Sequence, residues 1–423
     1  MKREERKKKR KLILTAMLFC VTLCVPLSLF SQSQDFEMNG TTLVKYNGNA
    51  ANVTIPEGVT AIGERAFGWN KSLTSVTIPS SVTSIGDSAF LQCSSLASIT
   101  IPSSVTSIGK VAFAVCSSLT SIIVDIQNSA YSSIEGILFN KDGTVLVRYP
   151  EGKQERDYTI PLSVTFIGDY AFYGCNNLTS VSIPSSVTSI GDSAFWNCTS
   201  LTSTTIPSSV TSIGDYTFAN NRLTSITIPS SVTSIGNWVF SGCNSLTNIT
   251  IPEGVTSIGN SAFNMCGRLT SITIPASVIS IGNDAFYGCD SLLSITVNIQ
   301  NSAYSSVDGI LFNKDKNIIV KYPEGKQERT YIIPSSVTVI GDGAFDNCRS
   351  LTSVTIPSGV SSIANGAFRR CINLTSVTIP SSVTTIGGFA FYNCSNLRTV
   401  VISRRTRIDT STFPSTAQIT YSD

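Results

Sequence analysis

Apolar and polar residues follow a pattern that returns every 23 residues along most of this chain. In the repeat Leu73–Ser95, LTSVTIPSSVTSIGDSAFLQCSS, Val76 and Ile78 alternate with hydroxyl residues. This period of two predicts a β-strand with one buried face. Pro79 ends the strand, because proline cannot donate to a strand ladder.

The second half of the repeat brings further apolar residues inward. The segment SVTSIG predicts an extended return path in which Val82 and Ile85 point into the core, and Gly86 permits a turn. In the segment DSAFLQC, Asp87 is placed to cap a short helical turn, and Phe90 is one of its inward positions.

One repeat cannot bury both of its sides, so neighbouring repeats must stack into a solenoid. A period of 20 to 29 residues with this Leu spacing is typical of a leucine-rich repeat. The predicted fold is an α/β leucine-rich-repeat solenoid: a curved parallel sheet with short helical turns, mostly β and irregular, with inserted β-hairpins. Its phenylalanines would stack as a spine. An Ile-Pro step marks twelve repeats, at Pro56, Pro79, Pro102, Pro161, Pro184, Pro207, Pro229, Pro252, Pro275, Pro334, Pro357 and Pro380.

Two charged inserts of 36 residues interrupt the period. In the first, GILFN and TVLVRYP are joined through KDG, which predicts a β-hairpin. Both inserts contain the identical octapeptide YPEGKQER, at 149–156 and 322–329, and the two copies are 173 residues apart. This constant spacing indicates a recent duplication. Inserts of this kind often lie on the binding face of a solenoid.

A shortened third copy of the hairpin, at residues 40–56, precedes the first run of repeats. The predicted organisation is a signal peptide or signal anchor (1–33), an N-terminal capping hairpin (34–55), block 1 with three repeats (56–124), insert 1 (125–160), block 2 with six repeats (161–297), insert 2 (298–333), block 3 with three repeats (334–402) and a C-terminal cap (403–423).

The repeats LTSVTIPSSVTSIGDSAFLQCSS and LTSVTIPSSVTTIGGFAFYNCSN resemble the Treponema-type, or BspA-like, leucine-rich repeats of bacterial and protist surface proteins. The resemblance covers residues 52 to 402. It implies a secreted or cell-surface protein, and some members bind host matrix proteins or other microbes. The family pattern contains no catalytic residues, so none is carried over.

The N-terminus supports an extracytoplasmic location. Residues 2–11 carry eight basic and two acidic side chains, and the apolar run Leu12–Phe30 follows. This order is typical of a secretory signal. Alternatives are an uncleaved anchor, because 19 residues can just span a bilayer, and a lipid-modified Cys24. The membrane is therefore expected to touch only this segment, if it is uncleaved or lipidated. Without residues 2–11 the net charge is −3, from 22 basic and 25 acidic residues, so no nucleic-acid partner is expected.

Cysteine recurs at one position of the repeat. Equivalent residues on adjacent rungs lie about 5 Å apart with parallel Cα–Cβ vectors, which does not suit a disulfide. Buried thiols acting as small hydrophobic groups are expected instead. A zinc site is disfavoured, because the chain has no His and no C-x-x-C pair. The ten residues are Cys93, Cys116, Cys175, Cys198, Cys243, Cys266, Cys289, Cys348, Cys371 and Cys394.

The outward strand positions form the candidate partner-binding surface, which we call the hydroxyl face. Three interpretations stay open: a purely structural role, since Thr suits strands, binding of glycan or extended polypeptide, and ice binding. The face comprises Ser75, Thr77, Ser98, Thr100, Ser180, Ser182, Ser203, Thr205, Ser225, Thr227, Asn248, Thr250, Ser271, Thr273, Ser294, Thr296, Ser353, Thr355, Ser376 and Thr378. Candidate hairpin contacts are Lys153, Arg156, Lys326 and Arg329.

These patterns favour a non-enzymatic, adhesin-like protein that binds an extracellular protein or glycan. The alternative is a structural, self-associating envelope protein. An enzyme is disfavoured, because catalysis needs one unique constellation and the carboxylates here recur once per repeat. No phosphate-binding loop or G-x-S-x-G motif occurs. No cofactor or metal is expected.

Overall fold

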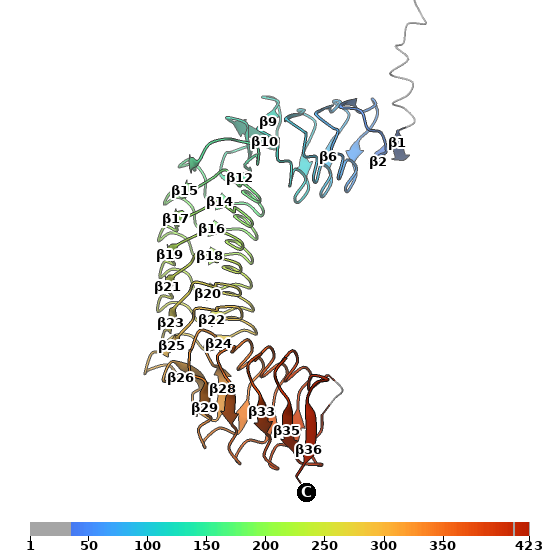
Figure 1. Cartoon of the computed structure of the whole chain (residues 1–423). Coiled ribbons are helices and arrows are strands. Elements are labelled where there is room, and N and C mark those ends of the chain that lie inside the picture. Colours follow the sequence, from blue (N-terminus) through green and yellow to red (C-terminus); the bar gives the residue numbers. More distant parts are fainter. Residues whose placement is uncertain (1–34, 409–410, 423) are drawn as a thin grey trace, which may run out of the picture. The chain divides into compact units, whose positions relative to one another are not determined.

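Each repeat contributes two strands to the structure. The computed structural model describes residues 35–408 and 411–422. In one repeat of block 2, β17 (Ser203–Thr205) pairs in parallel with β15 (Ser180–Ser182), and β18 (Ser212–Ile213) pairs in parallel with β16 (Ser189–Ile190). Two rows of parallel strands therefore run along the stack (Figure 1). The predicted solenoid is confirmed, and the predicted return path is itself a paired strand.

The predicted helical turns are wrong: the described residues contain no helix. Ser193 (φ 56°) and Asn197 (φ 60°) adopt the left-handed conformation on either side of Phe195, and this breaks helical hydrogen bonding. The amides of these three residues instead donate to carbonyls of the next rung, at 2.8 to 2.9 Å. The turns thus form a third set of bonds between rungs.

The Asp at the expected capping position also links rungs. Asp192 Oδ1 accepts a hydrogen bond from the backbone amide of Asp215 at 2.9 Å, and Asp215 Oδ1 accepts one from Asn237 at 2.7 Å. The same bond recurs where Asn replaces Asp, since Asn237 Oδ1 accepts from Asn260 at 2.9 Å. The side chain therefore caps the next rung rather than its own turn.

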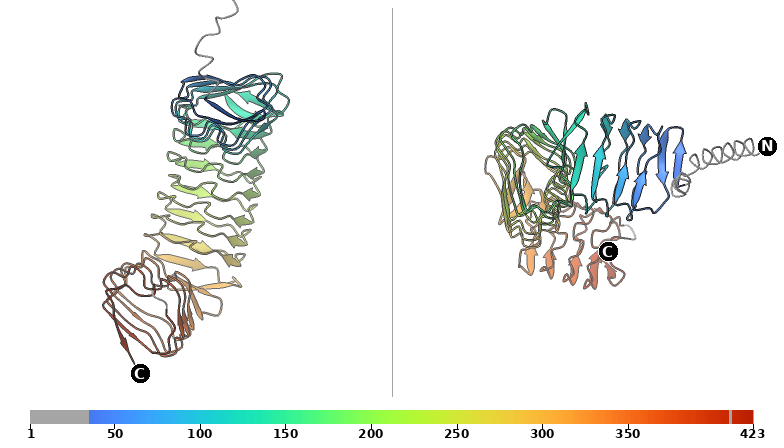
Figure 2. Two further views of the ribbon diagram at one scale, coloured as in Figure 1. Left: turned by 90° about the vertical axis from the view of Figure 1, so that its right-hand side faces the viewer. Right: turned by 90° about the horizontal axis from the view of Figure 1, so that it is seen from above.

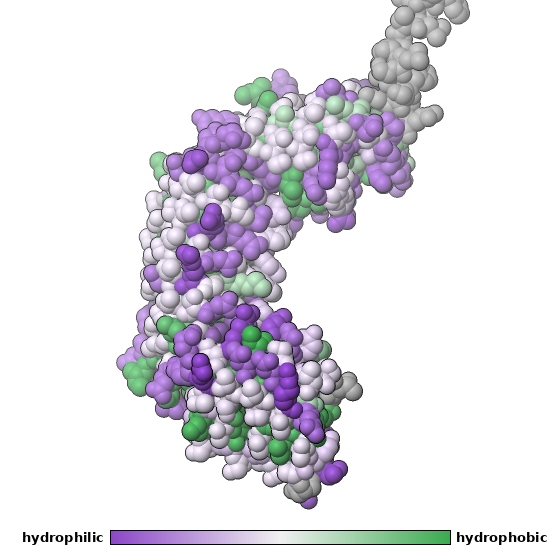
Figure 3. Space-filling view, in the orientation of Figure 1, coloured by the Kyte–Doolittle hydropathy of each residue, from purple (hydrophilic) through white to green (hydrophobic). Residues whose placement is uncertain are grey.

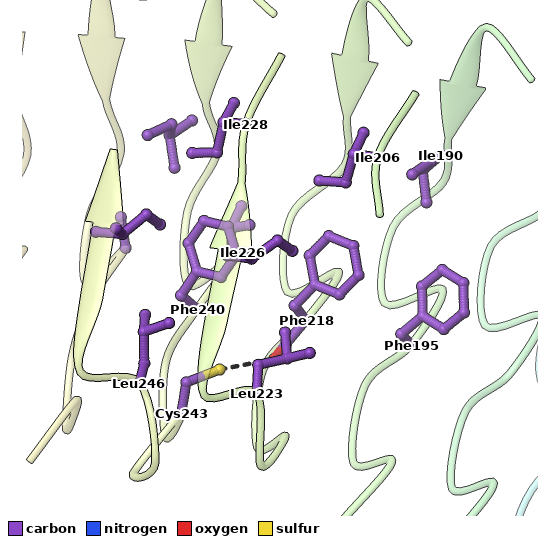
Figure 4. Close-up of a cluster of buried hydrophobic side chains, with 14 of the residues drawn as sticks. Ile190, Phe195, Ile206, Phe218, Leu223, Ile226, Ile228, Phe240, Cys243 and Leu246 are labelled. Atoms are coloured by element: carbon purple, nitrogen blue, oxygen red, sulfur yellow. Dashed lines mark hydrogen bonds between the residues drawn. The ribbon is translucent and has the colours of Figure 1, made fainter. Parts of the chain in front are cut away.

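The predicted phenylalanine spine is confirmed. Phe195 and Phe218 stack with their ring centroids 5.4 Å apart, and Phe218 and Phe240 stack at 5.8 Å. All three rings are fully buried (Figure 4). The Leu, Val and Ile positions of the repeat surround them.

The described residues form two compact units, which divide between Tyr131 and Ser132. In the N-terminal unit, β1 (Phe36–Asn39) pairs antiparallel with β2 (Thr42–Tyr46), which begins one row of parallel strands. That row continues with β4 (Ala61–Ile62), β6 (Ser84–Ile85) and β8 (Ser107–Ile108). The other row contains β3 (Asn52–Thr54), β5 (Ser75–Thr77), β7 (Ser98–Ile101) and β9 (Ser121–Val124). The predicted signal sequence lies outside the described residues.

The C-terminal unit has the same two rows, seen side-on in Figure 2. Besides β15 and β17, its longer strands are β13 (Asp157–Thr159), β19 (Ser225–Thr227), β21 (Asn248–Thr250), β23 (Ser271–Ile274), β25 (Ser294–Val297), β29 (Thr330–Ile332), β31 (Ser353–Thr355), β33 (Ser376–Thr378), β35 (Thr399–Ile402) and β36 (Gln418–Tyr421). Besides β16 and β18, the second row contains β12 (Val145–Arg148), β14 (Phe166–Ile167), β20 (Ser234–Ile235), β22 (Ser257–Ile258), β24 (Ser280–Ile281), β28 (Ile318–Lys321), β30 (Val339–Ile340), β32 (Ser362–Ile363) and β34 (Thr385–Ile386).

Each insert has one strand more than predicted. In insert 2, β26 (Tyr304–Val307) pairs antiparallel with β27 (Ile310–Asn313), and β27 pairs antiparallel with β28. β28 then pairs in parallel with β30, so the insert delivers the first strand of the next block. Insert 1 contains the corresponding β10 (Tyr131–Ile134) and β11 (Ile137–Asn140).

At the C-terminal end, β36 pairs in parallel with β35, and Phe413 stacks on Phe391 at 5.1 Å. The last rung is therefore covered. Within residues 35–408 and 411–422, no helix with the length and hydrophobicity of a membrane span occurs.

Candidate functional site

The hydroxyl face lies on the outward positions of the longer strands. Eighteen of its residues are exposed, and only Ser180 and Ser294 are partly buried. Parallel pairing sets Ser180 beside Ser203 and Thr227 beside Thr250. The surface over the rungs of block 2 is mostly pale in Figure 3, the colour of intermediate hydropathy. The face is thus a regular array of small polar groups.

Most of these polar groups point to solvent. At the start of block 2, Ser180 Oγ donates to Asp157 Oδ1 at 2.5 Å. From Ser203 to Thr296, no hydroxyl-face side chain forms a side-chain hydrogen bond with another described residue. These groups are therefore available to a partner.

Insert 2 covers the end of this array in block 2. The Gly309 carbonyl accepts a hydrogen bond from Ile295 N at 2.8 Å, and Ser306 Oγ accepts one from Val297 N at 3.0 Å. Gly309 has φ 75°, and a Cβ there would lie 2.6 Å from Ser294 Oγ. Glycine is required at this close approach, and the open face of block 2 ends here.

The first residue of the octapeptide extends the phenylalanine spine. Tyr322 is buried and stacks on Phe345 at 5.2 Å, while its amide donates to the Ala344 carbonyl at 2.7 Å. Tyr149 does the same with Phe172 at 5.3 Å. In the N-terminal unit, Tyr46 packs on Phe67 at 5.3 Å. All three hairpins thus begin a spine with tyrosine.

A buried ion pair stands beside this tyrosine in each full copy. Arg148 pairs with Glu151 in insert 1, and Lys321 Nζ lies 2.9 Å from Glu324 Oε1 in insert 2. Burial opposes the charge of Lys321, but the Glu324 carboxylate, together with Cys348 and Asp346, outweighs it, so the pKa of Lys321 is raised. The octapeptide therefore supplies the acid for a base on the preceding strand.

The four candidate hairpin contacts divide into two kinds. Lys153 pairs with Glu155 at 3.2 Å and Lys326 pairs with Glu328 at 3.1 Å, and their side chains are only 12% and 13% exposed. Arg156 and Arg329 are exposed. The lysines are thus held within the octapeptide, and the arginines are the groups presented to solvent.

The ten repeat cysteines are all buried, and none forms a disulfide, as predicted. Cys243 Sγ donates to the Phe218 carbonyl on the preceding rung at 3.1 Å (Figure 4). Burial raises the pKa of the Cys198 and Cys243 thiols from 9.0 to about 12. Among the described residues, no three Cys, Asp or Glu side chains come together in a way that would hold a metal ion.

A family model described as "BspA type Leucine rich repeat region (6 copies)" matches residues 44–152, 151–266, 211–319 and 324–423. The chain belongs to this family. No curated protein matches it by sequence.

Three solved structures are similar to this chain. A leucine-rich repeat protein from Eubacterium ventriosum is 30% identical with a TM-score of 0.53, over 66% of this chain and 71% of that one. The pneumococcal vaccine antigen PcpA is 22% identical with a TM-score of 0.54, over 70% and 93% of the two chains. A leucine rich cell surface protein from Faecalibacterium prausnitzii is 27% identical with a TM-score of 0.49, over 92% and 93%.

The sequence reasoning missed two buried asparagines of this BspA-type chain. Asn301 donates to the Pro275 and Val278 carbonyls at 2.7 and 2.8 Å and accepts from the amides of Ala303 and Tyr304. Asn347 donates to Glu324 at 2.7 Å. The segment NSAY occurs in both inserts, and this repetition was a usable signal for the first asparagine but not for the second.

Proposed function

We propose that this BspA-type protein is secreted or displayed at the cell surface and binds an extracellular protein or glycan without catalysing a reaction. The observation that carries the proposal is the array of exposed Ser and Thr side chains in register on parallel strands. Such an array offers many hydrogen-bond donors and acceptors with little charge. Open faces of solenoids commonly serve as binding surfaces.

The N-terminal sequence supports the location. Its basic run and apolar run have the order of a secretory signal, and the resemblance to surface proteins implies the same compartment. The carboxylates of Asp192 and Asp215 support a binding role, because each links neighbouring turns instead of joining a catalytic constellation.

The test is a binding screen of residues 34–423 against immobilised matrix proteins and glycans. Two double variants test which face binds. The first, Thr205→Lys with Thr227→Lys, changes the hydroxyl face. The second, Ser212→Lys with Ser234→Lys, changes the second strand row of the same repeats. All four residues are exposed, so both variants should fold. We expect only the first to lose binding. No ligand in the screen, or equal loss in both variants, would contradict the proposal. Sedimentation of the same chain as a large assembly would favour self-association instead.

A further inference from the structure

The start of block 3 holds a polar hollow beside the second octapeptide. It has a volume of about 530 Å³ and is lined by Gln327, Arg329, Arg349, Ser350, Thr352 and Asn373. We call it the arginine hollow. Its size lies in the range of small-molecule sites. Its lining carries two positive charges, no carboxylate and no apolar side chain of any size.

Hydrogen bonds fix the backbone of both arginines and the side chain of Arg349. The Arg329 carbonyl accepts hydrogen bonds from the Thr352 amide at 2.7 Å and from Thr352 Oγ1 at 3.0 Å. Arg349 Nε donates to Asn347 Oδ1 at 2.8 Å, and Asn373 Nδ2 donates to the Arg349 carbonyl at 2.7 Å. The backbones are thus fixed, and Arg349 is oriented through one nitrogen only, which leaves its other guanidinium nitrogens for a ligand.

The orienting residue is itself fixed. Asn347 is 5% exposed, and its Nδ2 donates to Glu324 Oε2 at 2.7 Å and to Asp290 Oδ1 at 2.9 Å. Its carbonyl oxygen therefore points toward Arg349. This chain of contacts preorganises the guanidinium, and preorganisation favours binding.

The nearest acids of the octapeptide do not neutralise the hollow. Glu328 pairs with Lys326 at 3.1 Å and accepts from the Tyr322 hydroxyl at 3.4 Å. Glu324 pairs with buried Lys321. Each of these carboxylates has its own base, and no carboxylate lines the hollow, so no acid of the octapeptide pairs with Arg329 or Arg349.

We propose that the arginine hollow binds an acidic sugar, with a carboxylate or sulfate on the two guanidinium groups and sugar hydroxyls on the surrounding polar side chains. Arginine suits both anions because its planar fork donates two parallel hydrogen bonds. Gln327, Ser350, Thr352 and Asn373 supply the donors and acceptors that hydroxyl groups require. A protein partner would favour an aromatic anchor beside the arginines, and the lining offers none. The inference rests on the proposed function, since it names the class of one ligand.

Insert 1 gives a matched comparison within the same chain. The residues 173 positions earlier are Gln154, Arg156, Asn176, Asn177, Thr179 and Ser200. Asn176 stands where block 3 has Arg349, and Gly174 stands where it has Asn347. Arg349→Asn therefore installs a residue that the fold already accepts at the equivalent position.

The experiment titrates residues 34–423 with hexasaccharides of hyaluronan (carboxylate only), of sulfated dextran (sulfate only) and of dextran (neutral) by calorimetry. We expect an acidic probe to bind and dextran not to bind. Arg349→Asn and Arg329→Gln should each weaken the acidic probe about tenfold or more, the usual value of a charge-assisted hydrogen bond. Arg222→Asn removes the same charge from an exposed site in block 2 and should leave affinity unchanged.

Three outcomes would overturn the inference: equal binding of dextran, equal loss in all three variants, or no acidic probe bound at low salt. Circular dichroism confirms that each variant is folded. If no acidic probe binds but another ligand of the screen does, the inference fails and the proposed function stands.

Discussion

The two copies of YPEGKQER have identical sequences but different surroundings. In both, the tyrosine starts the aromatic spine, the first Glu pairs with a base on the preceding strand, and the Lys pairs with the second Glu. Around them, Arg148 becomes Lys321, Gly174 becomes Asn347 and Asn176 becomes Arg349.

This comparison indicates which residues of the inserts have a structural role and which are expected to bind a ligand. The constant residues are mostly buried or paired, so they build the first rung of a block. Of the residues that changed between the copies, Arg349 lies beside the exposed Arg329 in the lining of the arginine hollow and adds a positive charge to that surface. The identity of the octapeptide thus indicates a shared structural role, and binding is expected to follow its neighbours.

The largest effect is expected from the tyrosines. Tyr149→Ala and Tyr322→Ala each remove a buried ring at the end of a spine. Each should lower the free energy of unfolding by about 3 to 5 kcal/mol, as for other buried aromatic residues. Urea denaturation measures the loss. A loss in one copy but not in the other would break the structural equivalence of the two inserts.

The ion pairs should distinguish the copies. Glu151→Gln leaves Arg148 charged and buried, because a guanidinium keeps its proton, and should cost about 3 kcal/mol. Glu324→Gln leaves Lys321, whose pKa burial would then lower, so the amine can lose its proton.

The stability of these two variants should depend on pH in different ways, because Lys321 can lose its proton and Arg148 cannot. In the Glu324→Gln variant, the unfolded chain binds more protons at Lys321 than the folded chain, so stability rises with pH. The loss of unfolding free energy in Glu324→Gln should therefore shrink between about pH 6 and about pH 9. The loss of unfolding free energy in Glu151→Gln should stay constant over the same range. Denaturation at several pH values measures both, and parallel curves for the two variants would contradict the account.

The lysines should have the smallest effect. Lys153→Ala and Lys326→Ala remove pairs whose acids are 51% and 52% exposed. Each should cost less than about 1 kcal/mol, the usual value of a pair open to solvent. Acidic-sugar affinity should change less than in Arg349→Asn. A larger loss of affinity in Lys326→Ala than in Arg349→Asn would indicate that the octapeptide, and not the arginine hollow, binds the sugar.

The repeat pattern was sufficient to predict the solenoid, the spine and the buried thiols, because apolar spacing alone determines what each rung buries. It did not reveal the left-handed turns: Ser193 and Tyr216 have no sequence feature that marks a positive φ. The sequence predicts a helix cap at Asp87, yet its Oδ1 accepts a hydrogen bond from Lys110 N on the next rung at 2.7 Å. The partner of Asp87 is set by the stacking of neighbouring rungs, which the sequence of a single repeat does not show.

The candidate site was predicted in part. The outward Ser and Thr positions followed from the strand period, and Arg329 was named from its charge. Arg349 was not named, because it is one residue of an ordinary repeat and only the fold brings it to Arg329. The charge of the octapeptide predicts Lys326 as a contact together with Arg329, but the ion pair of Lys326 with Glu328 could not be read from the octapeptide.

The most direct test of the central claim, that binding follows the neighbours of the octapeptide, is the stoichiometry of acidic-sugar binding after an exchange. The variant carries Gly174→Asn, Asn176→Arg, Asn177→Ser and Ser200→Asn, which places the block 3 residues beside the first octapeptide. Gly174 has φ 73° and Asn347 has φ 63°, so asparagine suits this position. Calorimetry should give one acidic hexasaccharide per wild-type chain and two per variant. Two on the wild-type chain, or one on the folded variant, would contradict the account.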